Sequence, residues 1–231
     1  MLKVALIGYG YWGAKLARNF QNSESFSLDV VVDNDPKNLL LAKKNYPNVG
    51  SFLNYKKAIV ENDVDLIIIA SPTVSHFSIA KFSLEKSKHI LVEKPLSLSL
   101  NEVKRLNKIA KKKKKMIFVD YPFLFSGTTN FIKKIINKNI YGKILEIESY
   151  REQAPVRKDA NVIWDLGTHD VSILSYLLKK NPYQIKTIKL KSLKGLLCDS
   201  AYINLKYKDN LNVLIKNTWI SPIKIRLIKI K

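Results

Sequence analysis

The sequence predicts an α/β protein: a doubly wound parallel sheet, followed by an α+β domain with a largely antiparallel sheet. Two observations support this. Through the first half of the chain, short continuous apolar runs alternate with amphipathic stretches of helical length, as in a parallel sheet covered on both faces. From Gln184 onward, polar and apolar residues alternate in runs joined by short polar turns such as residues 208–210, which indicates antiparallel strands.

The first domain is expected over residues 1–121, where strands and helices alternate along the chain. Strands are expected in the apolar runs at residues 3–7, 28–32, 66–70, 89–92 and 116–120, with a short segment at 49–52. Helices are expected between them, at residues 14–20, 36–45, 55–61, 75–85 and 98–112. A helical crossover returns the chain to the same end of the sheet, so these strands are expected to be parallel.

The second domain is expected over residues 122–231, because the rhythm of the sequence changes after Tyr121-Pro122. Helices are expected at residues 129–138 and 165–179. Strands are expected at residues 143–150, 184–190, 202–207, 212–219 and 224–230.

Composition excludes several classes of protein. Hydrophobic residues make up 46% of the 231 residues and aromatic residues 10%, which argues against a disordered chain. The longest clean apolar run, Leu66–Ala70, is far too short to span a membrane. The single cysteine, Cys198, excludes an internal disulfide and leaves no cysteine cluster for zinc. We therefore expect a cytoplasmic protein without a metal centre.

The formal net charge of +21 raises the question of a polyanionic partner. Only five of the 40 basic residues are arginine, the residue on which specific phosphate and base recognition usually depends. The densest lysine run, Lys111–Lys115, falls at the end of an expected helix, where cations suit the helix dipole. A solvated surface is the favoured interpretation, and binding of nucleic acid, with its steep salt dependence, is the alternative.

A glycine-rich turn follows the first strand at once, in the pattern G-Y-G-Y-W-G of residues 8–13. Gly8 permits a tight turn, Gly10 lets the backbone approach a pyrophosphate, and Gly13 lets the next helix pack closely on the sheet. The helix N-terminus supplies free N–H groups and a positive dipole end for the phosphates. The pattern predicts a Rossmann dinucleotide-binding domain, the alternative being glycines that serve the turn alone.

An acidic residue stands at the end of the second expected strand. Asp33 lies twenty residues after Gly13, where a carboxylate would bind the ribose 2′-hydroxyl of NAD and repel the 2′-phosphate of NADP. Asp35 adds a second negative charge, and no arginine follows nearby in the sequence to receive a phosphate. NAD is therefore the expected cofactor, with NADP as the weaker ligand.

Two further groups are candidates for proton transfer. The strand at 89–92 leads into Glu93-Lys94-Pro95 at the carboxyl edge of the parallel sheet, where such folds bind ligands. Partial desolvation there lowers the pKa of an amine toward that of a useful base, the alternative being a surface lysine before a strand-ending proline.

Asp165 and His169 are expected to share a helix face, where a carboxylate can orient an imidazole. The alternative makes Asp165 an N-cap and His169 its helix partner, without catalysis.

Taken together, these motifs resemble the glucose–fructose oxidoreductase, inositol dehydrogenase and rhizopine catabolism (Gfo/Idh/MocA) family. The resemblance runs along the chain through the glycine motif, Ser71-Pro72-Thr73 with His76, Glu93-Lys94-Pro95, Tyr141-Gly142-Lys143, Arg151 and the D-L-G-T-H-D segment of residues 165–170. It implies an NAD-dependent oxidoreductase that transfers a hydride between nicotinamide and a hydroxyl or keto carbon of a sugar or nucleotide-sugar. The alternative is a non-catalytic module of the same family that binds NAD(H) or a sugar.

The resemblance also implies roles for individual residues. The implied catalytic residues are Lys94, Asp165 and His169. The implied substrate-binding residues are Lys94, Arg151, Asp165 and His169. The residues implied at the cofactor are Gly8, Gly10, Tyr11, Trp12, Gly13, Asp33, Ser71, Pro72, His76, Glu93 and Lys94.

Two departures from the family pattern stand out. Many members carry an aspartate three residues after the histidine, whereas this chain has Ser172 there and Asp170 directly beside His169. The D-L-G-T-H-D form resembles a branch associated with surface-polysaccharide and nucleotide-sugar pathways. Family members are also longer, so the resemblance implies that the second domain, for substrate and oligomerisation, is shortened at its C-terminus and incomplete.

The strands after Gln184 carry apolar or aromatic residues in both phases, such as Tyr202 and Leu205, or the consecutive Trp219 and Ile220. A monomer tends to avoid exposing such residues as a contiguous patch. Family members commonly pair through this sheet. The resemblance and the pattern together predict a homo-oligomer, a dimer or a tetramer, that acts on a small molecule and not at a membrane.

Overall fold

The computed structural model describes residues 1–153, 156, 160–191 and 198–231 of the chain. The chain divides into two compact units, Met1–Asp120 and Tyr121–Lys231. No helix in the described part of the chain is long and apolar enough to cross a membrane. The expected class is confirmed: the first unit is a parallel α/β unit and the second contains a separate, largely antiparallel sheet.

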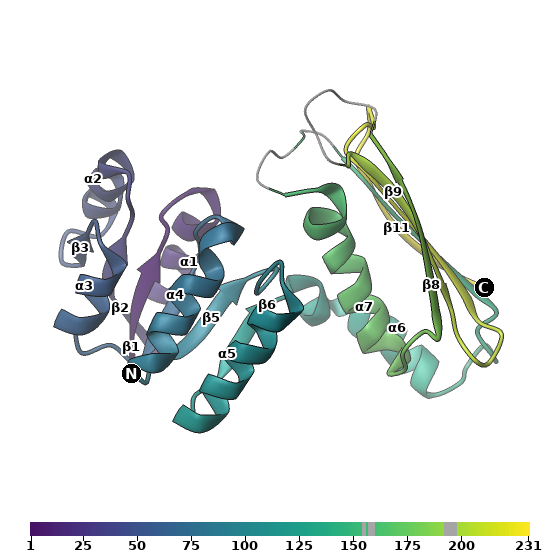
Figure 1. Ribbon diagram of the computed structural model, residues 1–231, viewed down its shortest axis with the longest axis horizontal. Helices are drawn as coiled ribbons and strands as arrows, with labels where there is room; N and C mark the ends of the chain where they lie inside the picture. Colours follow the sequence, from purple (N-terminus) through teal and green to yellow (C-terminus); the bar gives the residue numbers. More distant parts are fainter. Residues whose placement is uncertain (154–155, 157–159, 192–197) are drawn as a thin grey trace. The chain divides into compact units, whose positions relative to one another are not determined.

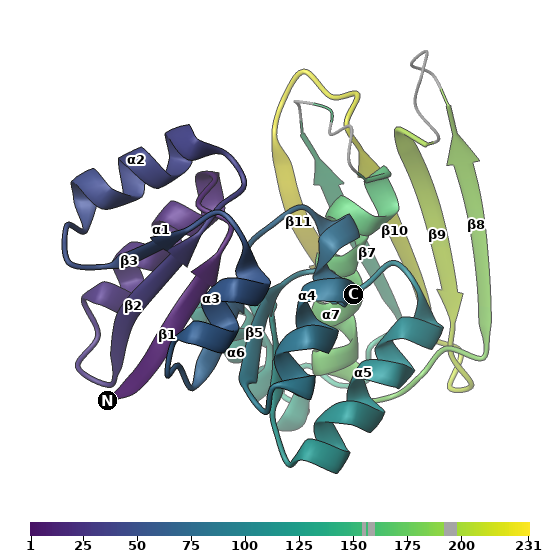
Figure 2. The same cartoon turned by 60° about the vertical axis from the view of Figure 1, so that its left-hand side comes forward.

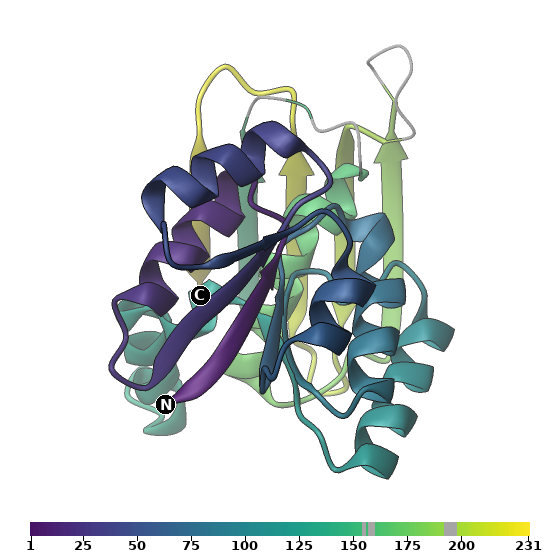
Figure 3. The same cartoon turned by 90° about the vertical axis from the view of Figure 1, so that its left-hand side faces the viewer.

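The first unit contains a six-stranded sheet in the order β3-β2-β1-β4-β5-β6, with every pairing parallel. Figure 3 views this unit from the left-hand side of Figure 1. Its strands are β1 (Leu2–Ile7), β2 (Phe26–Val32), β3 (Gly50–Phe52), β4 (Leu66–Ile69), β5 (His89–Glu93) and β6 (Ile117–Asp120). The chain moves outward from β1 to β3 and then returns to add β4 on the other side of β1. This reversal makes the carboxyl ends of β1 and β4 the point at which such sheets bind ligands.

Five helices of the first unit cover both faces of this sheet. They are α1 (Tyr11–Gln21), α2 (Pro36–Asn45), α3 (Tyr55–Glu61), α4 (Thr73–Glu85) and α5 (Leu100–Lys113). One apolar core contains buried residues of α3, α4 and α5, whereas a second, on the opposite side of the strands, contains Ala17 of α1 and Ala42 of α2. The run Lys111–Lys113 occupies the last turn of α5, as the helix-dipole interpretation requires.

The second unit begins with a 3₁₀ turn, η1 (Pro122–Phe125), and the helix α6 (Gly127–Asn137). Strand β7 (Glu146–Glu152), a π-helical turn η2 (Ile163–Gly167) and helix α7 (Thr168–Leu178) follow. The last strands are β8 (Gln184–Leu190), β9 (Ser200–Lys206), β10 (Asn212–Thr218) and β11 (Ile225–Ile230). These strands form one sheet in the order β11-β7-β10-β9-β8 (Figure 2). Helices α6 and α7 lie along one face of this sheet (Figure 1).

Only the pairing of β10 with β7 is parallel among the described strands of this second sheet. Its helix-covered face carries Ile147 and Ile215, which pack with Leu174 of α7 in one apolar core. Of the consecutive pair Trp219 and Ile220, Trp219 is buried against Val162 and Leu166, whereas Ile220 is exposed.

Candidate active site

The glycine turn packs directly against the neighbouring strand. Gly8 has a φ of +96°, and a Cβ atom there would lie 2.7 Å from the carbonyl carbon of Ala70. A Cβ atom on Gly13 would lie 1.9 Å from the carbonyl oxygen of Gly8, so the first turn of α1 can fold back only without a side chain. Gly10 differs, because a Cβ atom there would meet nothing within 4 Å. The backbone at Gly10 therefore borders open space, which fits the close approach of a pyrophosphate.

Helix α1 begins at Tyr11, earlier than expected, so the glycine turn runs straight into the helix. No side chain caps this helix at Gly10 and no acidic residue lies in its first turn, which leaves the helix N–H groups for a phosphate. The exposed rings of Tyr11 and Trp12 form an edge-to-face pair, with centroids 5.4 Å apart. Lys15 Nζ donates to the Tyr11 hydroxyl at 2.8 Å and adds a cation beside the turn.

Asp33 is nearly buried at the carboxyl end of β2, where it binds the glycine turn itself. Its Oδ2 accepts hydrogen bonds from the backbone N–H of Tyr9 at 2.6 Å and from Asn38 Nδ2 at 3.2 Å. Its Oδ1 accepts from the backbone N–H of Asp35 at 2.8 Å. A carboxylate has about four acceptor positions, of which these bonds use three. The Asp35 carboxylate instead caps α2 through the N–H of Lys37.

Lys94 follows β5 at the same edge of the sheet and is half-buried, as is Glu93. The peptide bond between Lys94 and Pro95 is cis. The buried side chain of His76 lies between two loops of this edge, with Nδ1 2.8 Å from the carbonyl oxygen of Pro95 and Nε2 2.9 Å from that of Ser71. Pro72 precedes the first residue of α4. His76 thus connects the loop after β4 to the loop that carries Lys94.

Asp120 is a residue of this edge that sequence reasoning missed. It ends β6 and pairs in register with Glu93 at the end of β5. Burial raises the pKa of the Asp120 carboxyl above its ordinary value. A single aspartate at the end of a short strand carries no sequence signal for this, because the burial depends on the neighbouring strands.

In the second unit, Asp165 lies within the π-helical turn rather than in a regular α-helix. Its buried carboxylate accepts a hydrogen bond from the indole Nε1 of Trp219 at 3.1 Å. The N-cap alternative for Asp165 is wrong: Asn161 Oδ1 accepts instead from the backbone N–H groups of Ile163 and Trp164, at 3.1 Å each. The wide turn accommodates Gly167, where a Cβ atom would lie 2.8 Å from Asn217 Oδ1.

His169 lies in the first turn of α7, with its ring edge-to-face against Phe123 and the centroids 5.0 Å apart. The same phenyl ring lies 4.6 Å from the Cζ atom of Arg151. Ser172, which stands where many family members carry an aspartate, donates to the backbone carbonyl of His169 at 2.8 Å. Phe123 is therefore a common contact of two predicted site residues, and nothing in the sequence around it indicated this role.

Asp170 points toward the sheet and is fully buried. Its Oδ1 accepts from Ser149 Oγ at 2.9 Å and from Arg151 Nε at 3.2 Å, and its Oδ2 accepts from Asn217 Nδ2 at 2.7 Å. These donors lie on β7 and β10, so Asp170 anchors α7 to the sheet.

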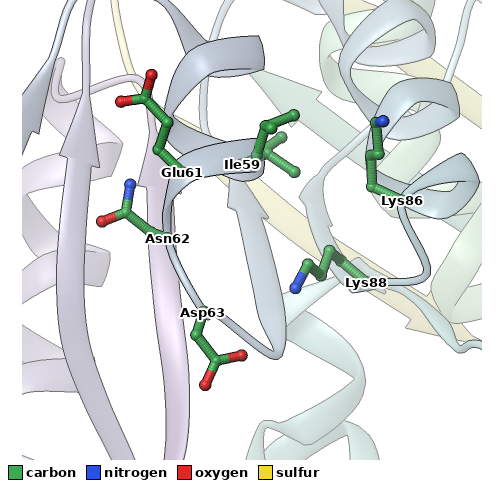
Figure 4. Close-up of a pocket in the computed structure, with 7 residues that line it drawn as sticks. Ile59, Glu61, Asn62, Asp63, Lys86 and Lys88 are labelled. Carbon is green, nitrogen blue, oxygen red and sulfur yellow. The ribbon is translucent and has the colours of Figure 1, made fainter.

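Two hollows on the described surface lie near different parts of the chain. The first, of about 470 Å³, is lined by Ile59, Glu61, Asn62, Asp63, Lys86 and Lys88, among others (Figure 4). Asp63 and Lys88 precede β4 and β5, so this hollow lies at the amino edge of the parallel sheet, away from the ligand edge. The second, of about 630 Å³, runs along α7 and is lined by Trp164, Thr168, Val171, Ser172 and Tyr176, among others.

The structure thus gathers the predicted residues into two sets. In the first unit, the glycine turn, Asp33, Ser71, His76, Glu93 and Lys94 lie at the carboxyl edge of one sheet. In the second unit, Asp165, His169 and Arg151 lie where the start of α7 meets the sheet. The roles assigned to individual residues stay predictions.

Residues 2–121 match the family model of the Gfo/Idh/MocA proteins, described as an oxidoreductase family with an NAD-binding Rossmann fold. This match covers more than half of the 231 residues. It includes the glycine turn, Asp33 and Lys94.

Several proteins that are similar to this chain are named as oxidoreductases or dehydrogenases. The uncharacterized oxidoreductase YdgJ of Escherichia coli is 27% identical over 150 residues, covering 64% of this chain and 42% of YdgJ. Glucose-6-phosphate 3-dehydrogenase of Bacillus subtilis is 24% identical over 234 residues, covering 93% of this chain and 62% of that protein. The crystal structure of myo-inositol 2-dehydrogenase from Lactobacillus plantarum has a TM-score of 0.91 at 20% identity, covering 99% of this chain and 73% of that one. The chain therefore spans less than two thirds of these two curated relatives.

Proposed function

The chain belongs to the Gfo/Idh/MocA family of NAD-binding oxidoreductases, and from this premise we propose that it is an NAD-dependent dehydrogenase. Its proposed substrate is a sugar or nucleotide-sugar, from which a hydride passes between a CH–OH carbon and nicotinamide. The observation that carries the proposal is the carboxyl edge of the first sheet. There, the open backbone at Gly10, the Asp33 carboxylate and Lys94 follow three strands of one parallel sheet.

NAD supplies the hydride chemistry when it is bound. The N–H groups at the start of α1 would bind its pyrophosphate, and Asp33 would accept a hydrogen bond from its adenosine ribose. Tyr11 and Trp12 flank this turn, while Ser71, Pro72, His76 and Glu93 shape the adjoining loops. We assign these residues to cofactor binding.

Lys94 and His169 are the proposed proton acceptors. In the oxidation, the substrate hydroxyl gives its proton to the Lys94 amine or the His169 imidazole, and the carbon gives up a hydride with the C–H electron pair. The product is a carbonyl group, and the reverse reduction uses the same groups. Asp165 orients the imidazole of His169, and Asp165, His169 and Arg151 bind the substrate. The second unit is therefore proposed to bind the substrate.

The decisive experiment measures cofactor binding and turnover separately. NAD binding is measured by calorimetry, and turnover by the absorbance of reduced cofactor with myo-inositol, glucose, sugar acids, sugar phosphates and nucleotide-sugars. We expect NAD to bind and at least one of these compounds to be oxidised. Tight NAD binding without turnover of any of them would support the non-catalytic module instead.

A pair of variants then tests the role of Lys94. Lys94→Met removes the amine at the carboxyl end of β5, and we expect turnover to fall by about 10²-fold or more while NAD still binds. Lys88→Met is the matched control, because Lys88 precedes the same strand at its amino end. Turnover near the wild-type rate in Lys94→Met would contradict the assignment.

We also propose that the protein acts in the cytoplasm as a homo-oligomer that pairs through the second sheet. The lone, buried thiol of Cys198 suits a reducing compartment. The open face of that sheet, which carries the exposed side chains of Ile188 and Leu227, supports the pairing.

A further inference from the structure

Two arginines of the second unit stand directly opposite each other. Arg151 of β7 and Arg226 of β11 are register partners, so their side chains share one face of the sheet. That face also carries Ser149, which bonds to Asp170 of α7. Like charges directly opposite each other destabilise a strand pair. Such an arrangement needs a compensating negative charge.

The described residues supply only part of that charge. Asp170 accepts a hydrogen bond from Nε of Arg151, while Arg226 Nη2 donates to the neutral side-chain oxygen of Gln153 at 3.2 Å. Arg151 is 4% exposed, and its Nη1 is buried without a hydrogen-bond partner among the residues that the structure describes. Among the described residues, the carboxylate of Asp170 is bonded to Arg151, and no carboxylate is bonded to Arg226.

An aromatic ring connects this pair to the predicted catalytic histidine. The phenyl ring of Phe123 lies 4.6 Å from Cζ of Arg151 and 5.6 Å from Cζ of Arg226. The ring of His169 lies edge-to-face against the same phenyl ring, at 5.0 Å. The two guanidinium groups and the imidazole therefore surround one side chain, within the span of a single small molecule.

We propose that Arg151 and Arg226 form an anion subsite, and that the substrate is a sugar bearing a carboxylate or a phosphate. This inference rests on the proposed function, since it names the class of sugar that the dehydrogenase takes. A planar guanidinium matches the paired oxygens of either anion and binds both through charge-assisted hydrogen bonds. The anion supplies the negative charge that the arginine pair lacks, and the adjoining hydroxyl-bearing carbon lies toward His169.

The test compares three compounds of one sugar skeleton, measured by calorimetry on the NAD-loaded protein at physiological salt. Glucose is neutral, glucuronate carries a carboxylate, and glucose 6-phosphate carries a phosphate. We expect at least one anionic compound to bind about tenfold or more tightly than glucose, because a hydrogen bond to a charged group contributes that much. The tighter of the two identifies the anion.

Arg226→Gln then removes one guanidinium from an exposed position, so the fold should be kept. We expect it to bring the affinity for the anionic compound close to that for glucose, with NAD affinity unchanged. Arg226→Lys keeps the charge without the planar fork and should recover part of the preference. Arg105→Gln, an exposed arginine of α5, is the matched control for the general positive charge and should keep the full preference.

The results separate this inference from the proposed function. Equal binding of the three sugars, or an anion preference that survives Arg226→Gln, would overturn the anion subsite. Neither result bears on NAD binding or on the loss of turnover in Lys94→Met, which test the proposed function. An anion preference that depends on Arg226 would support the subsite even if another sugar skeleton proves to be the one oxidised.

Discussion

The Asp170 carboxylate and the Arg151 guanidinium form a buried ion pair, with Oδ1 and Nε 3.2 Å apart and both side chains at most 5% exposed. Ser149 and Asn217 complete the bonds to the carboxylate. The pair ties the start of α7, which carries His169, to β7 and β10. A buried charge is tolerated only when it is paired and hydrogen-bonded, so this pair controls both the stability of the second unit and the position of its predicted site.

Replacing Asp170 should therefore cost much stability. Asp170→Asn leaves the Arg151 charge buried without its ionic partner, and we expect a loss of about 3 kcal/mol in the free energy of unfolding. Urea denaturation, followed by the fluorescence of Trp164 and Trp219 in the second unit, measures it. The matched control is Asp209→Asn, which removes the acid of an exposed ion pair with Lys180 and should change stability little. Equal effects of the two changes would contradict the argument.

The glycine turn gives a sharp contrast between two substitutions. Gly13→Ala would place a Cβ atom 1.9 Å from the Gly8 carbonyl oxygen, which forces the backbone to move. We expect it to lose about 3 kcal/mol of stability. Gly10→Ala meets nothing within 4 Å, so it should fold normally yet bind NAD more weakly, by about tenfold, because its methyl group enters the space left for the pyrophosphate.

Thermal unfolding and calorimetry with NAD distinguish the two glycine variants. A stable Gly13→Ala variant would show that the turn tolerates a side chain there. Unchanged NAD affinity in Gly10→Ala would place the pyrophosphate elsewhere.

The ligand edge of the first sheet could be predicted from the sequence, whereas the arginine pair of the second sheet could not. Gly8, Gly10 and Lys94 follow strands of a parallel sheet, and the local rules of that fold place them at one edge. Arg226 could not be assigned in this way. Its partnership with Arg151 depends on β11 pairing with β7, which lies far away in the sequence, and alternation along a strand does not specify which strand is its neighbour.

The start of α7 also has features that the local sequence does not predict. Spacing alone predicts a shared helix face for Asp165 and His169, but the wide turn at Ile163–Gly167 arises where Gly167 meets Asn217 of a distant strand. The burial of Trp219 and its bond to Asp165 likewise follow from packing between distant segments. Tertiary contacts, rather than local preference, determine these features.

Asp33 should determine the choice between NAD and NADP. Its carboxylate already accepts three hydrogen bonds and stays close to the glycine turn, so a 2′-phosphate would meet a fixed negative charge. We expect NAD to bind about tenfold more tightly than NADP. Asp33→Asn removes the charge and keeps one oxygen acceptor for the Tyr9 N–H, at the loss of the bond from the Asp35 N–H, and it should narrow the difference. Calorimetry with both cofactors measures this preference.

The control for this charge effect is Asp63→Asn, which removes an exposed carboxylate from the opposite edge of the same sheet. It should leave the preference unchanged. Equal or tighter binding of NADP by the wild-type protein would show that Asp33 serves the turn alone.

Asp120 should make stability depend on pH. Burial raises the pKa of its carboxyl in the folded protein, so the unfolded chain ionises first as the pH rises. The folded state loses stability as the pH rises from the ordinary aspartate pKa through the raised value, and the loss is complete above it. Asp120→Asn should therefore raise the melting temperature at pH 7 and have a smaller effect at pH 4. Destabilisation by this variant at pH 7 would mean that the ionised carboxylate is favoured in the fold.

The open face of the second sheet supports pairing of two copies. One register row crosses all five strands on the face opposite α7, through Ile188, Tyr202, Lys216, Tyr150 and Leu227. Ile188 and Leu227 are 64% and 44% exposed. An interface that repeats the same patch on both partners is the usual form of a two-fold dimer. We therefore expect wild-type protein to be a dimer, or a tetramer built from such dimers, at low micromolar concentration.

Light scattering on two variants tests this surface. Tyr202→Glu places a negative charge within the patch on each partner, which would be buried in the interface, so the assembly should dissociate to monomers. Leu40→Glu introduces the same charge at an exposed position of α2 in the first unit and should leave the assembly intact. A monomeric wild-type protein would refute the dimer. A Tyr202→Glu variant that stays assembled would show that the interface lies outside this face of the sheet.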